Sequence, residues 1–340
     1  MSKIVYLPYR TVRHKTWQAV RKRIPKKQRK RHKDDAMTAA IGRVLLGVPG
    51  MMATLETNVL VDEEAYIENG SRMYFPESPA MLEMLWRAKM KVGLEDLDMS
   101  LIPPAFSVAW PRCEIEGAEL HGCLVAIMTG HQYNDLCKRF GKKYLGREAE
   151  RHKLTGRTSD DVPGLHISYW GDVINGEPML VRTAVPGTFL TKCLQSEGDY
   201  SEYMDSFGKF HLLGTIDLDE KDRYQNYVMA KLIIHMLVYM QACPDQVHHG
   251  IPDGHKHREF SGPYDSISPT RVRAPVSLQG THASPSVHWR SWHFRSYPRR
   301  KDGTKRKGAI KIAGTLVNAE GVDPETVEDE ALRARIEARS

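Results

Sequence analysis

The stretch from Tyr224 to Cys243, YQNYVMAKLIIHMLVYMQAC, contains the longest apolar run of this 340-residue chain, Val228–Cys243. Only Lys231, His235 and Gln241 interrupt the run, which is shorter than the roughly 20 residues that a membrane span needs. We therefore expect a buried helix that lies across a sheet as the central element of the core. Within such a helix, His235 is predicted to be a satisfied buried histidine and not a ligand.

Four runs in the middle of the chain have the pattern of β-strands, because they are apolar or alternating and are bounded by Gly, Pro or Asn. These runs are Phe106–Trp110, His121–Thr129, Leu165–Trp170 and Met179–Thr183. Between them, residues Asn134 to Arg157 are a basic insertion that is helical or irregular.

The flanking segments predict shorter elements. Helices are expected over Arg10–Ile24, from Asp34 or Asp35 to Leu46, over Met81–Val92 up to Gly93, and from Asp323 onward. A loop-like region is expected before Tyr74, and a polar loop region over Pro244–Pro275. A β-hairpin is expected to pair Val287–Tyr297 with Gly308–Asn318, through a basic connection at Pro298–Lys307.

This order of elements favours an α+β fold with a central, mostly antiparallel sheet packed by the long apolar helix. The C-terminal basic β-hairpin completes the predicted architecture. We divide the chain into a basic N-terminal arm (residues 1–33), an α+β core (34–285), and a basic aromatic hairpin with a short C-terminal helix (286–340).

Positive charge is concentrated near the two ends of the chain. The net charge is +7, yet residues 1–33 hold thirteen Lys or Arg and no acid, and residues 286–311 hold nine with only Asp302. The remaining residues are therefore acidic on balance. This distribution predicts a polyanionic partner that binds at particular places. Solvated, charge-rich tails are the alternative interpretation.

The cysteines and the N-terminus indicate where the protein works. Five dispersed cysteines with no CxxC pair favour free thiols in a reducing compartment. The first residues become basic at once and no apolar stretch follows, so no signal peptide is predicted. We expect a cytoplasmic protein without a membrane partner. The cysteines are Cys113, Cys123, Cys137, Cys193 and Cys243.

The segment VHWRSWHFRSYPRRKDGTKRKGAIK, from Val287, interleaves aromatic and basic side chains. On a strand, Trp292, Phe294 and Ser296 would point to one face while His293, Arg295 and Tyr297 point to the other. One face can pack on the core while the other offers guanidinium groups and a ring to phosphates and bases. The alternative is a core face of aromatics with a solvated face of arginines. The predicted RNA-binding residues here are Arg290, Trp292, Arg295, Tyr297, Arg299, Arg300, Lys301, Lys305, Arg306 and Lys307.

The N-terminal arm supplies a second set of candidate RNA-binding residues. Arginine-rich segments often fold on RNA, but they also bind DNA, ribosomal surfaces or acidic proteins. The candidates are Arg21, Arg23, Lys26, Lys27, Arg29, Lys30 and Arg31.

Histidines suggest two further chemistries. The spacing HH-x5-H-x-H of His248, His249, His255 and His257 offers imidazoles to zinc but matches no known zinc motif, so a polar loop is the main alternative. Paired histidines beside arginines, at His288 and His293, have the residue types for metal-independent RNA cleavage. Nothing matches a nucleotide-binding loop, a nucleophile elbow or a zinc-protease helix, and we predict no cofactor.

The C-terminal segment resembles a phage and mobile-element family that includes an anti-CRISPR protein. Members end in a similar His-Arg-Gly-His-Trp hairpin, followed by basic residues and an apolar strand that closes near an Asn. Here these parts stand as His288–Phe294, Arg299–Lys307 and Ile310–Asn318. Ser291 replaces the expected Gly, and the basic N-terminal arm is an addition.

Looser similarities follow in the same order along the chain. They are Phe75-Pro76 before a helix, the strand at Phe106–Trp110, and the helix that ends Ala242-Cys243-Pro244-Asp245.

The resemblance implies a counter-defence protein that acts during translation. The family's anti-CRISPR member suppresses production of the type V effector nuclease: it recognises the emerging polypeptide and brings about loss of the transcript. For this chain it implies a phage-encoded protein in the host cytoplasm that binds RNA, the ribosome or a nascent polypeptide and that down-regulates a host or competitor gene. A host nuclease is a further candidate partner. A ribonuclease and a DNA-binding or virion packaging protein are the alternatives.

Overall fold

The computed structural model describes the central part of the chain and several shorter pieces around it. The described residues are 4–9, 51–92, 96–145, 163–174, 177–185, 187–194, 199–201, 203–204, 220–260, 267–274, 288–290, 293–297, 304, 306–312 and 315–317. The helices expected at Arg10–Ile24, at Asp34–Leu46 and from Asp323 lie outside these residues.

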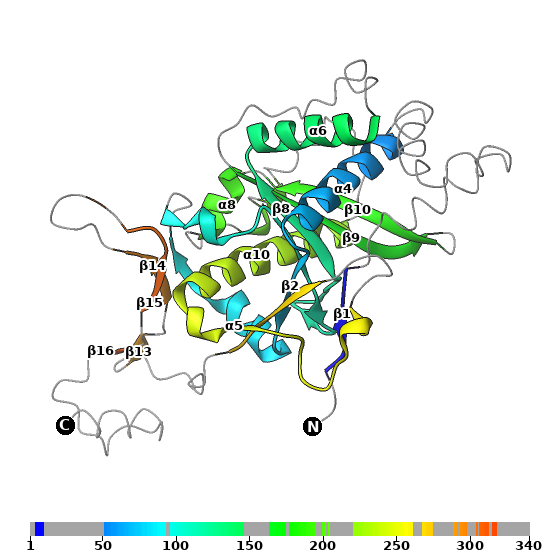
Figure 1. Ribbon diagram of the computed structural model, residues 1–340. Coiled ribbons are helices and arrows are strands. Elements are labelled where there is room, and N and C mark those ends of the chain that lie inside the picture. The colour runs from blue at the N-terminus through cyan, green and yellow to red at the C-terminus, as the bar shows by residue number, and fades with distance from the viewer. Residues whose placement is uncertain are drawn as a thin grey trace, which may run out of the picture.

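A seven-stranded sheet is the centre of the fold (Figure 1). Its strand order is β10-β9-β8-β4-β2-β12-β11. The pairings β2–β4 and β2–β12 are parallel, and the other four are antiparallel. The strands are β2 (Arg72–Pro76), β4 (Ala105–Val108), β8 (Cys123–Met128), β9 (Gly164–Ile174), β10 (Glu177–Val185), β11 (Val247–His249) and β12 (Ser268–Val272).

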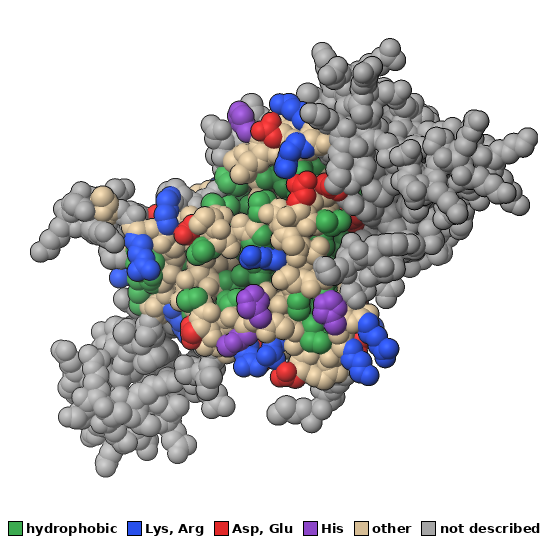
Figure 2. All heavy atoms as spheres, viewed as in Figure 1, with side chains coloured by type: hydrophobic (Ala, Val, Ile, Leu, Met, Phe, Trp, Pro, Cys, Tyr) green, Lys and Arg blue, Asp and Glu red, His purple; other side chains and the backbone are tan. Residues whose placement is uncertain are grey.

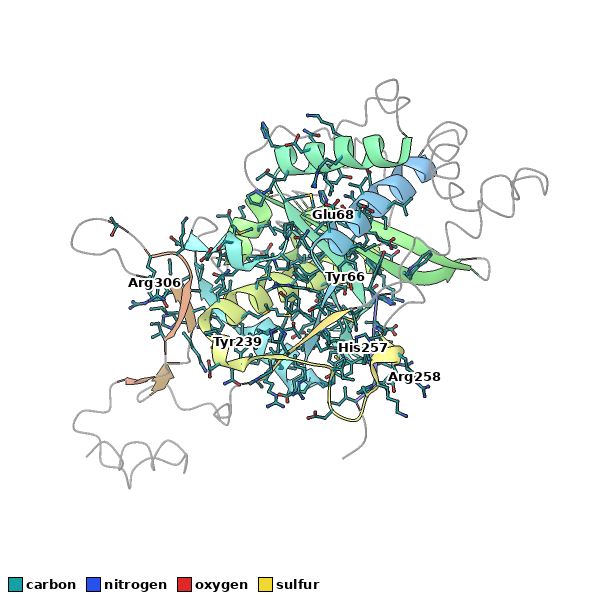
Figure 3. The ribbon with its side chains drawn as sticks, in the orientation of Figure 1. Tyr66, Glu68, Tyr239, His257, Arg258 and Arg306 are labelled. Atoms are coloured by element: carbon teal, nitrogen blue, oxygen red, sulfur yellow. The ribbon has the colours of Figure 1, made fainter. Side chains whose placement is uncertain are left out.

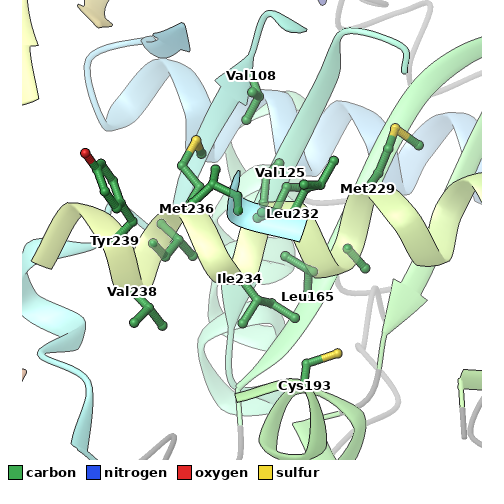
Figure 4. Close-up of a cluster of buried hydrophobic side chains, with 14 of the residues drawn as sticks. Val108, Val125, Leu165, Cys193, Met229, Leu232, Ile234, Met236, Val238 and Tyr239 are labelled. Carbon is green, nitrogen blue, oxygen red and sulfur yellow. The ribbon is translucent and has the colours of Figure 1, made fainter. Parts of the chain in front are cut away.

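Helix α10 (Glu220–Ala242) packs against one face of this sheet. Every side chain from Gln225 to Tyr239 is buried except Lys231. Figure 4 shows its apolar side chains beside strand residues such as Val125 and Leu165. Helices α5 (Pro79–Arg87) and α8 (Gly187–Leu194) contact α10 and extend this layer. Burial of this continuous apolar surface at about 25 cal/mol per Å² is the main source of stability.

Helices α4 (Met51–Glu68) and α6 (Gly130–Leu145) pack on the opposite face of the sheet (Figure 1). Successive strand residues point to opposite faces, so Val125 faces α10 while Leu124 and Ala126 face α4 and α6. The described chain is thus an α+β fold with helices on both faces of a mixed sheet.

Two short strand pairs and three 3-10 helices of the described residues lie around this core. β1 (Tyr6–Leu7) pairs with β5 (Trp110–Pro111), and β6 (Glu114–Ile115) pairs with β7 (Ala118–Glu119). Gly122 lies directly against the backbone that follows β1, where a Cβ would overlap the Leu7 carbonyl oxygen. The 3-10 helices are η2 (Met99–Leu101), η5 (Pro244–Gln246) and η6 (His257–Glu259).

The C-terminal segment folds back on itself in two antiparallel pairs. β14 (His293–Ser296) pairs with β15 (Ala309–Ile312), and β13 (His288–Arg290) pairs with β16 (Thr315–Val317). β14 also pairs in parallel with β3 (Lys89–Lys91), which makes a three-stranded sheet β15-β14-β3. This sheet joins the C-terminal segment to the core.

Three expectations about local structure are wrong, and the first concerns the helix over Met81–Val92. It ends at Arg87, because Ala88 is extended (ψ 129°) and Lys89–Lys91 is strand β3. Met90 is fully buried there. Pairing with β14, which is distant in sequence, outweighs the local helical pattern.

The loop-like region before Tyr74 is instead helix α4, which ends at Glu68. Three consecutive acidic residues of α4, Asp62, Glu63 and Glu64, are buried. These acids break the apolar pattern by which a helix is recognised, although the helix packs on the sheet.

The polar region Pro244–Pro275 supplies two strands of the main sheet. β12 lies between β2 and β11 although its sequence, SPTRV, is mostly polar. Its place depends on pairing with Arg72–Pro76, almost 200 residues earlier in the chain, so no local pattern predicts it.

Candidate nucleic-acid interface

The two faces of β14 differ in exposure. Phe294 is fully buried, with its ring centroid 6.0 Å from that of Tyr239 on α10 in an edge-to-face contact. Arg295, the next residue, is exposed. This alternation anchors the inner face of the strand on α10 and turns the outer face toward solvent.

Strand β3 extends this outer face with two lysines. In the parallel register, Lys89 lies beside His293 and Lys91 lies beside Arg295. Lys89 and Lys91 are exposed, and Met90 between them is buried. Registered residues of neighbouring strands point to the same face, so Lys91 and Arg295 lie next to each other on the solvent side.

A guanidinium group lies over an aromatic ring at the end of β14. The Arg306 guanidinium carbon lies 4.6 Å from the ring centroid of Tyr297, within the range of a cation–π contact. Gly308 brings the chain back toward β15 with a φ of 109°, a conformation that L side chains rarely adopt. Its amide donates a hydrogen bond to the Asp96 carbonyl oxygen, which fixes the returning strand on the core.

We call Lys89, Lys91, Arg295, Tyr297 and Arg306 the basic sheet face. Among the described residues, Lys89, Lys91 and Arg295 form no ion pair with a carboxylate, and the contact of Arg306 is with a ring. Figure 2 shows Lys and Arg side chains gathered on the side of the molecule where Figure 1 places β14 and β15. The face is therefore cationic and open to a partner.

The structure brings together several of the predicted RNA-binding residues. Arg295, Tyr297, Arg306 and Lys307 lie on or beside β14 and β15, and all but the half-buried Tyr297 are exposed. Arg290 and His288 lie in β13, whose side chains are outside the description. The remaining candidates lie outside the described residues: Trp292, Arg299, Arg300, Lys301, Lys305, Arg21, Arg23, Lys26, Lys27, Arg29, Lys30 and Arg31.

The sequence did not predict Lys89 and Lys91 as site residues, because both lie within the helix that was expected over Met81–Val92. The signal that identifies them is the alternation Lys-Met-Lys after Ala88, which suits a strand with one buried side chain.

The four histidines considered for zinc are not gathered. His248 and His249 lie on β11, paired with Arg271 and Thr270. His255 is held by Glu259 (Nδ1 to Oε2, 2.8 Å), and His257 lies near the Ile267 carbonyl oxygen. No group of three His, Cys, Asp or Glu side chains suited to a metal occurs among the residues that the structure describes. Figure 3 shows Arg306 at the left edge of the described core and His257 away from it, in the lower part right of the centre.

A buried ion pair lies under α4. Asp62 accepts a hydrogen bond from the Arg182 Nε at 2.8 Å, and an Arg182 Nη lies 2.9 Å from His166 Nδ1. Burial alone would raise the pKa of Asp62, but Arg182 and His166 outweigh it and the pKa is lowered. Burial, reinforced by Arg182, lowers the pKa of His166. The hydrogen bonds and charges of Asp62, Arg182 and His166 are paired within the group. This is the arrangement of a structural ion pair.

A groove of about 730 Å³ lies between α4 and α6. Two ion pairs line its rim: Arg139 with Glu68 at 3.1 Å and Lys138 with Asp135 at 3.4 Å. Both cations are paired with carboxylates. The groove therefore has less unpaired positive charge for a polyanion than the basic sheet face has.

Comparison with known proteins adds no identification. The sequence matches no model of a known protein family, and no curated protein matches it. Among the helices that the structure describes, none has the length and apolar character needed to cross a membrane.

Proposed function

We propose that this protein binds RNA through the basic sheet face. The observation that carries the proposal is the set of exposed cations on two adjacent strands, Lys89, Lys91 and Arg295, that have no described carboxylate partner. A cationic surface with an aromatic ring beside it suits a ribose-phosphate chain, since the cations contact phosphates and the ring supports base stacking. Phe294 holds β14 against α10 through its edge-to-face contact with Tyr239.

We further propose that the RNA-bound protein acts as a phage-encoded, ribosome-associated regulator in the host cytoplasm. It lowers expression of a host or competitor defence gene during translation by engaging the nascent polypeptide and causing loss of the transcript, with a host nuclease as the agent of decay. The resemblance of the C-terminal segment supports this role. The α+β core supports this role by holding the basic sheet face at its surface.

The RNA-binding proposal is tested by charge reversal. Arg295→Glu with Arg306→Glu should weaken binding to a short single-stranded RNA by about tenfold or more at physiological salt, and should lower the log–log salt slope by about 0.7 for each lost phosphate contact. Fluorescence anisotropy over a salt series measures both quantities. The matched control is Arg112→Glu with Arg258→Glu, two exposed arginines outside the basic sheet face. If the test variant and the control variant lose the same RNA affinity, the binding is non-specific attraction between RNA and positive charge, and the basic sheet face is not the site.

A second candidate, a metal-independent ribonuclease, rests on one pair of registered residues. His293 is the registered partner of Lys89, so a histidine and a lysine lie on neighbouring strands of the face proposed for RNA. RNA cleavage by the purified protein in EDTA, abolished by His293→Ala, would establish this activity. Unchanged RNA length over a long incubation would exclude it.

A further inference from the structure

We propose that strand β3 of the core is half of the binding site, and that the composite face takes a single-stranded RNA segment laid along β3 and β14. This inference rests on the proposed RNA binding and goes beyond it, because it assigns Lys89 and Lys91 to the site and names the form of the RNA. The sequence places these lysines some 200 residues before Arg295.

The first argument is the cross-strand pair of like charges. Lys91 and Arg295 are registered partners, and their strands lie about 4.8 Å apart. Like charges directly opposite each other destabilise a sheet. Neither side chain forms an ion pair with a carboxylate among the described residues. The arrangement opposes folding of the free protein, and a bound polyanion removes the conflict.

The second argument is the direction of the charges. Lys89 and Lys91 are two residues apart on one face of a strand, a separation of about 6.6 Å, while Arg295 extends the row across to β14. Arg306 continues it past the end of β14, where its guanidinium stacks on Tyr297. The cations thus form a short track that ends at a stacked pair.

The stacked pair favours a single strand over a duplex. Arg306 is exposed and lies over the Tyr297 ring, so its guanidinium group is accessible to an unpaired base. Guanidinium planes and aromatic rings stack on bases that are splayed out of a single strand, while double-stranded RNA is bound mostly through its backbone and 2′-hydroxyls. A track that leads to a stacking group therefore selects an unpaired segment.

The test uses the full chain and two labelled RNAs, a short unstructured single strand and a duplex of the same length. Lys89→Glu with Lys91→Glu should weaken single-strand binding by about tenfold or more and lower the salt slope by about 1.4. Arg306→Ala, which removes the exposed stacking group, should reduce the preference for single strand over duplex. Circular dichroism and thermal unfolding confirm that the variants are folded.

The outcomes separate this inference from the proposed function. If Arg295→Glu with Arg306→Glu weakens binding and the lysine pair does not, the site is confined to the C-terminal segment and the composite face is rejected. If the duplex binds as tightly as the single strand, the assignment of RNA form is rejected. If neither the arginine pair nor the lysine pair changes RNA affinity, both the composite face and the proposed RNA binding at this face are rejected.

Discussion

Two regions of this protein hold cations in opposite ways. Under α4, the Arg182 side chain is only 10% exposed and is hydrogen-bonded to the buried Asp62 carboxylate at 2.8 Å. On the basic sheet face, Lys91 and Arg295 are exposed and lie beside each other without a described carboxylate. The first arrangement is complete within the chain, and the second leaves its cations accessible to the proposed RNA.

The difference shows how to separate structural from binding charges. A buried charge without a partner costs several kcal/mol, so the fold supplies a counterion for Arg182. An exposed charge costs little, so an unmatched cluster can persist if it serves binding. Substitutions under α4 should therefore change stability, while substitutions on the basic sheet face should change RNA affinity.

The largest expected effect is that of Asp62→Ala. It leaves the Arg182 guanidinium buried without a carboxylate, which should lower the free energy of unfolding by about 3–5 kcal/mol. Urea denaturation followed by circular dichroism measures the loss. RNA affinity of the folded protein should stay unchanged, because Asp62 is not part of the basic sheet face.

The matched control is the double variant Asp62→Ala with Arg182→Met, which removes both charges. Replacing a buried ion pair by apolar side chains is often nearly neutral, so the double variant should recover most of the loss. A double variant as unstable as Asp62→Ala would show that packing, and not the unpaired charge, sets the cost.

A second prediction concerns acid. His235 is fully buried on α10, with Nδ1 2.6 Å from the Leu85 carbonyl oxygen, and burial lowers its pKa from 6.5 to about 4. Between these values the unfolded chain binds a proton that the folded chain does not. Stability should therefore be highest above pH 6.5 and fall by roughly 3 kcal/mol as the pH drops to about 4.

Urea denaturation at a series of pH values measures this slope. The loss at Asp62 falls in a separate, lower window, because its pKa lies below 3.8 and its stabilisation disappears only as the pH falls through that lowered value. His235→Gln keeps a donor for the Leu85 carbonyl oxygen but does not titrate, so its profile should be flatter between pH 6.5 and 4. A profile equal to that of the native protein would assign the acid sensitivity to other groups.

The parts of the fold that follow from local sequence are those with a strong hydrophobic pattern. The α10 helix and the strands around Val108, Val125 and Ile167 lie where apolar or alternating runs predict them. α4 and β12 were missed for different reasons. Buried acids such as Asp62 interrupt the pattern of α4, and β12 is defined by its pairing with distant residues.

The same contrast applies to the candidate site. Alternation along β14 predicts that Arg295 and Tyr297 face away from Phe294, and the burial of Phe294 agrees. No local pattern predicts that Lys91 lies beside Arg295, because the two strands meet only through tertiary pairing. The sequence thus predicts the basic and aromatic residues of β14 as candidates, but it does not predict that β3 joins β14 to form the site.

The smallest expected effect sharpens the comparison most, because stability and binding should move in opposite directions. Lys91→Thr removes the like-charge pair with Arg295 and places a residue with high strand propensity in β3. Relief of the repulsion should raise the free energy of unfolding by about 0.2–1 kcal/mol, while loss of a phosphate contact should weaken RNA binding several-fold and lower the salt slope by about 0.7. Denaturation and anisotropy on one preparation measure both.

Lys138→Thr, which removes a lysine paired with Asp135 on α6, is the control and should produce neither a change in RNA binding nor a gain in stability. If Lys91→Thr lowers both stability and affinity, Lys91 supports the strand itself, and its unmatched charge is not kept for a partner.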